Sequence, residues 1–215
     1  MKRYLVAICM MCMFASNGLA QLPSTYKELC EHYKFWEDEQ DTAKMLKVLK
    51  RGFKLYPEEH FFVTNLMAIR IAKKDFNEAR SVMKKAIKKV PGDPLYWYLS
   101  GHLNEASGNW VDAEYNYLQA LSIDKDYVQA ITGMGGLYYR RGLRLIEEGE
   151  KNKMSEAECV EAARPSFMIA LQYLEKALSM QNDNYVAITN LMSIYKKTGD
   201  AKRYSDMEKR LEMLQ

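Results

Sequence analysis

The chain has 215 residues, of which 48% are hydrophobic and 27% are charged, and only five are prolines. This composition excludes an intrinsically disordered chain and supplies enough apolar material for the core of one domain. The formal net charge of +3 is too small to indicate a protein that binds nucleic acid.

The first twenty residues have the layout of a secretory signal peptide. Lys2 and Arg3 form a basic start, and residues 4–16 form a run of thirteen apolar residues. Gly18 and Ala20 place small residues at the −3 and −1 positions of a cleavage site. The apolar run is shorter than the roughly 20 residues that cross a bilayer, which favours cleavage over a retained anchor. We therefore expect an exported protein, periplasmic or secreted, whose mature chain 21–215 is not anchored in a membrane.

Removal of this segment changes the charge and the cysteine content. The mature chain has 29 basic and 28 acidic residues and is therefore nearly neutral. Cys30 and Cys159 are its two cysteines. An oxidising compartment permits a disulfide between them, but helical cysteines are also common as small buried apolar residues. The sequence leaves both alternatives open.

A pattern of small and large apolar residues recurs along the mature chain. In the segment that begins at Pro94, positions 4, 8, 15, 20, 24 and 27 are Trp97, Gly101, Gly108, Ala113, Tyr117 and Ala120. Counting back by 34 residues to His60 gives Val63, Ala79, Met83 and Ala86 at positions 4, 20, 24 and 27. Counting back again to Tyr26 gives Leu29, Met45, Leu49 and Gly52. A fourth unit begins at Val128, and a fifth begins at Tyr185 after 23 additional residues.

The segment from Pro94 closely resembles the tetratricopeptide repeat (TPR), in which the same positions are Trp, Gly, Gly, Ala, a large apolar residue and Ala. The resemblance implies an all-α fold in which each unit is a helical hairpin, with small residues where two helices cross closely. It implies about five hairpins stacked into a right-handed α-solenoid. The units are expected to begin near residues 26, 60, 94, 128 and 185.

The additional residues, about 143–163, fall at the turn of the fourth hairpin. Their sequence favours helix, and Ser155 with Glu158 fits a capping box. We therefore expect both helices of this hairpin to be lengthened, with Asn152 in the turn, and the alternative is a flexible loop. Pro165 is expected either to kink the long second helix or to begin a new one.

Signals of catalysis or cofactor binding are missing from the sequence. His32, His60 and His102 are widely separated and lack the spacing of a metal site. Phosphate-binding glycine motifs and a nucleophile elbow are also missing. We therefore expect a protein that is not an enzyme and has no cofactor and no metal. An enzyme would need a site built from scattered residues such as His102, Glu105 and Tyr139.

The resemblance implies a binding groove lined by the first helix of each hairpin. The residues at the groove-facing positions are Phe61, Thr64, Leu95, Tyr98, His102, Glu105, Gln129, Thr132 and Tyr139. Some TPR arrays hold a carboxylate with five Lys, Asn and Arg residues, and of the corresponding residues here only Asn65 matches. The expected partner is therefore a protein or peptide that the sequence does not identify. The alternative is an assembly protein that uses the lengthened hairpin, including self-association into a homo-oligomer.

Overall fold

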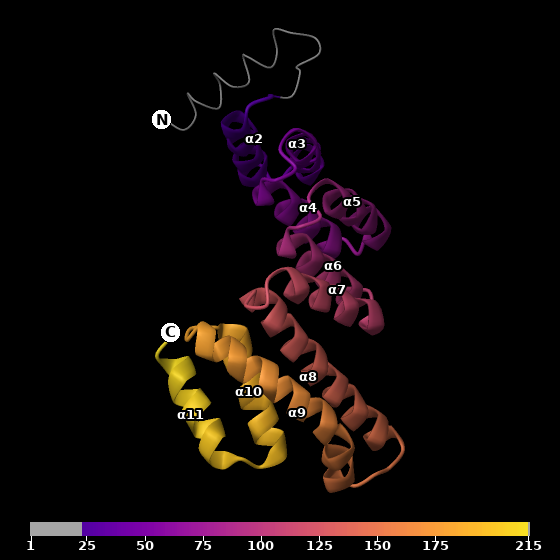
Figure 1. Cartoon of the computed structure of the whole chain (residues 1–215), viewed down its shortest axis with the longest axis vertical. Coiled ribbons are helices and arrows are strands. Elements are labelled where there is room, and N and C mark those ends of the chain that lie inside the picture. Colours follow the sequence, from indigo (N-terminus) through magenta and orange to yellow (C-terminus); the bar gives the residue numbers. More distant parts are fainter. Residues whose placement is uncertain (1–22, 215) are drawn as a thin grey trace. The chain divides into compact units, whose positions relative to one another are not determined.

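The computed structural model describes residues 23–214 (Figure 1). The expected signal peptide lies outside the described residues. Within 23–214 the chain forms ten helices and no strand, so the predicted all-α fold class is confirmed. The chain divides into two compact units, up to Ile69 and from Arg70 onward, and the boundary falls within the helix His60–Ala72.

The first unit contains α2 (Tyr26–Asp38), α3 (Thr42–Leu55) and most of α4 (His60–Ala72). Gly52 of α3 lies directly against the ring of Phe62, which leaves no space for a Cβ atom on Gly52. Tyr33 is buried with its ring against Phe61, and its hydroxyl lies 2.9 Å from Glu37 Oε1. Burial and this hydrogen bond raise the pKa of Tyr33 to about 12.

The second unit contains seven further helices, which lie in chain order as successive antiparallel neighbours (Figure 1). They are α5 (Phe76–Lys89), α6 (Pro94–Ala106), α7 (Trp110–Ile123), α8 (Val128–Lys151), α9 (Glu156–Met180), α10 (Tyr185–Thr198) and α11 (Ala201–Glu212). The first helices of the hairpins, α2, α4, α6, α8 and α10, begin at residues 26, 60, 94, 128 and 185. These are the residues at which the 34-residue pattern places the starts of the units.

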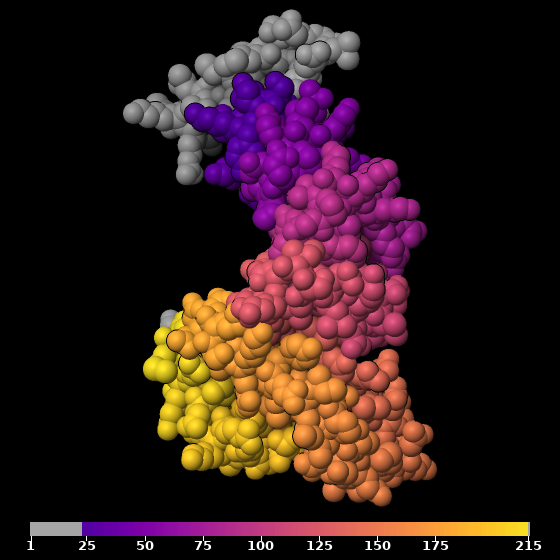
Figure 2. All heavy atoms as spheres, in the orientation of Figure 1, coloured from indigo at the N-terminus to yellow at the C-terminus, as the bar shows by residue number. Residues whose placement is uncertain are grey.

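The fourth hairpin has the lengthened helices that the sequence predicts. Helix α8 has 24 residues and α9 has 25, whereas α6 and α7 have 13 and 14. The two long helices lie side by side (Figures 1 and 2). Ser155 and Glu158 form the predicted capping box, and Asn152 caps the end of α8. The flexible-loop alternative is therefore wrong, and Pro165 lies inside the continuous helix α9 rather than at the start of a new one.

Two glycines end helices in a conformation that other residues adopt only with strain. Gly108 has φ +79° and Gly199 has φ +76°, and both follow the last turn of the first helix of a hairpin. The left-handed region is accessible to glycine because it lacks a Cβ atom. Gly199 is the C-cap of α10, and Gly108 directly follows Ser107, the C-cap of α6. Cys30 is partly exposed and Cys159 is buried, and both are free thiols.

Gly142 marks the close crossing of the two long helices. It is buried in α8, and a Cβ atom built on it would overlap the ring of Phe167 in α9. We expect Gly142→Val to lower the free energy of unfolding by about 1–3 kcal/mol, because a packed core resists added methyl groups. The shift is measured as a lower urea midpoint. Gly92→Val is the control, because a Cβ atom on Gly92 has nothing within 4 Å. Equal midpoints for the two variants would contradict the close crossing.

Candidate functional site: a groove between four helices

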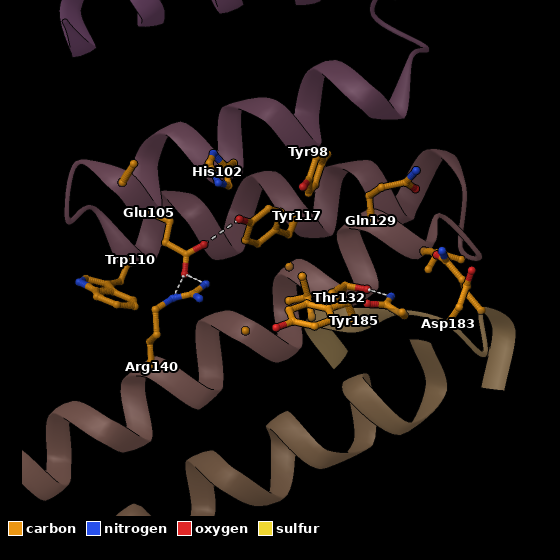
Figure 3. A pocket seen from close by; sticks show the side chains of 17 residues that line it. Tyr98, His102, Glu105, Trp110, Tyr117, Gln129, Thr132, Arg140, Asp183 and Tyr185 are labelled. Carbon is orange, nitrogen blue, oxygen red and sulfur yellow. Dashed lines mark hydrogen bonds and ion pairs between the residues drawn. The ribbon is translucent and has the colours of Figure 1, made fainter. Parts of the chain in front are cut away.

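A groove of about 840 Å³ lies in the second unit, between α6, α7, α8 and the start of α10. Figure 3 shows its lining side chains. Five of the residues that the repeat register assigns to a groove line it, namely Tyr98, His102, Glu105, Gln129 and Thr132. Buried Tyr117 and Asn184 are among its lining residues.

One side of the floor is a hydrogen-bonded cluster around Glu105. The Glu105 side chain is only 9% exposed. One carboxylate oxygen accepts a hydrogen bond from the Tyr117 hydroxyl at 2.9 Å. The other accepts from Arg140 Nε at 2.6 Å and also pairs with Arg140 Nη2 (Figure 3). Because the three residues come from α6, α7 and α8, the cluster ties these helices together with its charges balanced.

The position of Tyr117 depends on two glycines that the repeat pattern supplies. A Cβ atom on Gly101 of α6 would lie 2.5 Å from the Tyr117 ring, and one on Gly133 of α8 would lie 2.9 Å from it. The ring therefore fills the space that both glycines leave. Burial, followed by the Glu105 carboxylate, raises the pKa of Tyr117, so its hydroxyl remains a hydrogen-bond donor.

The other side of the floor is a hydrogen bond between α8 and the start of α10. Asn184 Nδ2 donates to Thr132 Oγ1 at 2.8 Å, while Asn184 Oδ1 accepts from the backbone N–H of Ala187 at 3.0 Å. One buried side chain thus caps α10 and fixes it to α8. Thr132 therefore lines the groove but is already engaged.

The rim of the groove differs from its floor because its polar groups are not engaged. Tyr98, His102, Gln129, Asp183 and Tyr185 have no side-chain hydrogen bond or ion pair to another residue within 23–214. Burial, followed by the Glu105 charge, raises the pKa of Tyr98, so its hydroxyl keeps its proton. The rim therefore presents donors and acceptors on aromatic surfaces, with Asp183 as its unpaired charge.

The remaining residues that the register assigns to a groove lie elsewhere. Phe61 and Thr64 belong to the first unit, where Phe61 packs against Tyr33 and Thr64 is exposed. Leu95 is half-buried at the start of α6 and does not line the groove. Tyr139 faces the packed interior, where its hydroxyl donates to Ser193 Oγ at 2.7 Å and its ring stacks on Phe167.

Several other residues line the groove although the repeat register does not assign them to it. Trp110, Tyr117 and Arg140 come from α7 and from the middle of α8, and Asp183 and Tyr185 come from the start of the fifth hairpin. Asp183 and Tyr185 reach the groove only because the hairpins stack. A signal was present for Tyr117, since Gly101 and Gly133 are small residues facing a large ring at the repeat's close crossings.

Residues 23–214 contain no group of three or more His, Cys, Asp or Glu side chains placed to hold a metal ion. Across the same residues, every helix is too short or too polar to cross a bilayer.

Comparison with protein families and curated proteins gives limited matches. No family model matches the chain. A segment of 71 residues, 33% of the chain, is 37% identical to cellulose synthase operon protein C of Xanthomonas axonopodis pv. citri (strain 306). The chain spans only 5% of the length of that protein.

Comparison with solved structures gives the same fold in several proteins. A monomeric mutant of IFIT1, solved with Gppp-AAAA, aligns with 80% of this chain at a TM-score of 0.68 and 16% identity, and this chain spans 37% of its length. MamA aligns with 85% of this chain and over 93% of its own length, at a TM-score of 0.54 and 16% identity. YrrB, described as a TPR protein with an unusual peptide-binding site, aligns over 89% and 87%, at a TM-score of 0.50 and 11% identity. The fold is therefore that of TPR-like helical repeats.

Proposed function

We propose that the protein is an exported, non-catalytic scaffold that binds a segment of another polypeptide in the groove between α6, α7, α8 and α10. The fold supports an interaction role, because stacked hairpins provide long grooves rather than an enclosed reaction site. The proposed export rests on Lys2, Arg3, the apolar run and the small residues before Gln21.

The observation that carries this proposal is the contrast between the floor and the rim of the groove. The floor groups Glu105, Tyr117 and Thr132 are hydrogen-bonded to neighbouring helices. The rim groups Tyr98, Gln129 and Tyr185 have side-chain donors and acceptors that no other residue within 23–214 engages. An extended peptide has free backbone N–H and C=O groups, whereas a helix has already paired its own. An extended segment therefore matches the rim better than a helix does.

The charges in the groove favour a polypeptide over a phosphate-rich ligand. Among the lining residues within 23–214, Arg140 is the only Arg or Lys, and Glu105 neutralises it. Asp183 leaves the groove slightly acidic. A phosphate backbone requires unpaired cations, whereas a peptide can be held by amide hydrogen bonds and aromatic contact.

The arrangement also supports a role without catalysis. His102, Glu105 and Tyr139 were the residues from which an enzyme site would have to be assembled. Glu105 is engaged by Arg140 and Tyr117, and Tyr139 is directed toward Ser193. The three side chains therefore do not converge on a common point where a substrate could react.

A peptide selection followed by an affinity comparison tests the proposal. A phage-displayed library of random peptides is panned on the tagged protein, and the dissociation constant of the best peptide is measured by calorimetry. We expect the double variant Gln129→Ala/Tyr185→Ala to weaken binding at least about tenfold, a loss of about 1.4 kcal/mol. Both side chains are exposed, so the fold should be unaffected.

Tyr139→Phe is the matched control for this comparison. It removes a hydroxyl from the same region of the fold, but one that is bonded to Ser193 and does not line the groove. Binding by this variant should equal that of the unaltered protein. Failure to enrich any peptide, or equal binding by the double variant, would show that the groove is not the recognition site.

A further inference from the structure

Helix α7 has an exposed apolar stripe that its packing does not require. Val111, Tyr115 and Leu118 are 79%, 56% and 44% exposed. Their spacing of i, i+4 and i+7 places them along one face of the helix over two turns. The buried residues of α7, such as Ala113 and Ala120, lie at other positions. We call Val111, Tyr115 and Leu118 the α7 stripe.

The other hairpins provide an internal comparison, because each has a second helix in the same register. All of the corresponding side chains are exposed. They are Ala43, Lys47 and Lys50 in α3, Asn77, Ser81 and Lys84 in α5, Met168, Gln172 and Glu175 in α9, and Lys202, Asp206 and Lys209 in α11. Each of these helices has at least two polar residues at the three positions, whereas α7 has none with a charge or an amide. The repeat fold therefore does not explain the α7 stripe.

A small hollow of about 160 Å³ adjoins the α7 stripe between α7 and α8. Trp110, Val111, Leu137 and Tyr138 give it an apolar lining, and its charged residues are Glu114, Arg141 and Arg144. Glu114 is already engaged, because its carboxylate accepts a hydrogen bond from the Tyr138 hydroxyl at 2.5 Å. The Arg141 guanidinium lies 5.9 Å from the centre of the Tyr138 ring. Arg141 has no carboxylate within ion-pair distance among residues 23–214, and Arg144 pairs only with exposed Glu148.

We infer that the α7 stripe docks an amphipathic helix of a partner protein, with acidic residues beside its apolar face. Apolar side chains at i, i+3 or i+4 and i+7 of such a helix match the stripe, which extends about 10 Å along α7. One apolar side chain of the partner would enter the hollow. Carboxylates beside it would pair with Arg141 and Arg144, which gives the surface its charge preference.

The size of the α7 stripe argues for a short helix rather than a second copy of the chain. A stable interface between folded proteins buries about 800 Å² on each side. Three side chains and one small hollow provide much less than this area. The site is also distinct from the groove, because it would receive a helix whose backbone is already hydrogen-bonded, rather than an extended segment.

A pair of designed peptides tests this inference on the full chain. The acidic probe is a synthetic helix of about 18 residues, long enough to be helical in water, with leucines on one face and glutamates beside them. The basic probe has lysines in place of the glutamates. We expect fluorescence anisotropy to show at least about tenfold tighter binding of the acidic probe, and this preference should weaken with added salt.

The matched variant is Val111→Asn/Tyr115→Ser/Leu118→Lys, which gives α7 the residues that α5 has at the same positions. It should lose at least about tenfold in affinity for the acidic probe. Because Tyr115 also contacts the Trp97 ring, Arg141→Glu provides a second variant that leaves the stripe intact. It should weaken binding of the acidic probe and strengthen binding of the basic one.

Three results would overturn the inference. The first is failure of the acidic probe to bind, and the second is equal affinity for both probes. The third is sedimentation that shows a dimer which the triple variant abolishes, because a second copy of the chain would then occupy the α7 stripe. The groove variant Gln129→Ala/Tyr185→Ala should bind the acidic probe normally. This result separates a failure of the groove proposal from a failure at the α7 stripe.

Discussion

Replacement of Tyr117 by alanine is expected to lower the free energy of unfolding by about 3–5 kcal/mol, the range observed when a large buried ring is removed. Tyr117 is 1% exposed, and its ring lies against Gly101 and Gly133. Neither glycine has a side chain that could move into the vacated space. The cavity would therefore persist, and the Glu105 carboxylate would lose a hydrogen bond.

Tyr117→Phe separates the two contributions, because it keeps the ring and removes only the hydroxyl. A hydrogen bond to a charged group contributes about 1.5–3 kcal/mol, so this variant should be destabilised less than Tyr117→Ala. Urea unfolding followed by circular dichroism gives both values. An alanine variant no less stable than the phenylalanine variant would mean that the ring is not part of the core.

The positions of the helices could be predicted from the sequence because they depend on local and repeated features. Gly101, Ala113 and Ala120 mark close helix crossings, and their spacing sets the 34-residue register. The lengthening of α8 and α9 could also be predicted from the sequence, because Ser155 and Glu158 form a capping box that defines where α9 begins. The start of each helix and the sites of close helix crossing thus depend on residues within one or two hairpins.

The groove was predictable only where one hairpin determines it. Tyr98, His102 and Glu105 project from one face of α6, so the register alone places them together. Tyr139 shares the register, but its ring stacks on Phe167 of α9 and its hydroxyl donates to Ser193 of α10, where the fifth hairpin packs. Its location depends on the angle between hairpins, which the sequence pattern does not specify.

Arg140 lines the groove although the repeat pattern did not predict it there. The register gave no reason to place it in the groove, but Gly136 lies one turn earlier in α8. Arg140 Nη2 lies 3.0 Å from the position that a Cβ atom on Gly136 would occupy. The missing side chain lets the guanidinium lie back along α8 toward Glu105. This contact between Arg140 and Gly136 is visible only in three dimensions.

Arg140→Met is expected to lower the free energy of unfolding by about 3 kcal/mol, near the lower end for breaking a buried ion pair. The Glu105 side chain is 9% exposed and would keep its charge without its main partner, whereas Arg140 itself is 42% exposed. The unpaired carboxylate, rather than the lost arginine, accounts for the cost. Arg141→Met is the control, because exposed Arg141 has no carboxylate partner within 23–214, and its effect should stay within about 0.5 kcal/mol.

A double-mutant cycle tests this explanation directly. If the cost of Arg140→Met comes from the stranded carboxylate, then Glu105→Gln/Arg140→Met should be more stable than Arg140→Met alone, because the amide has no charge to bury. Urea unfolding of the four proteins gives the coupling free energy between the two side chains. A double variant as unstable as the sum of the single variants would show that Glu105 and Arg140 contribute independently. In that case the balanced pair would not be what holds α6 and α8 together at the floor of the groove.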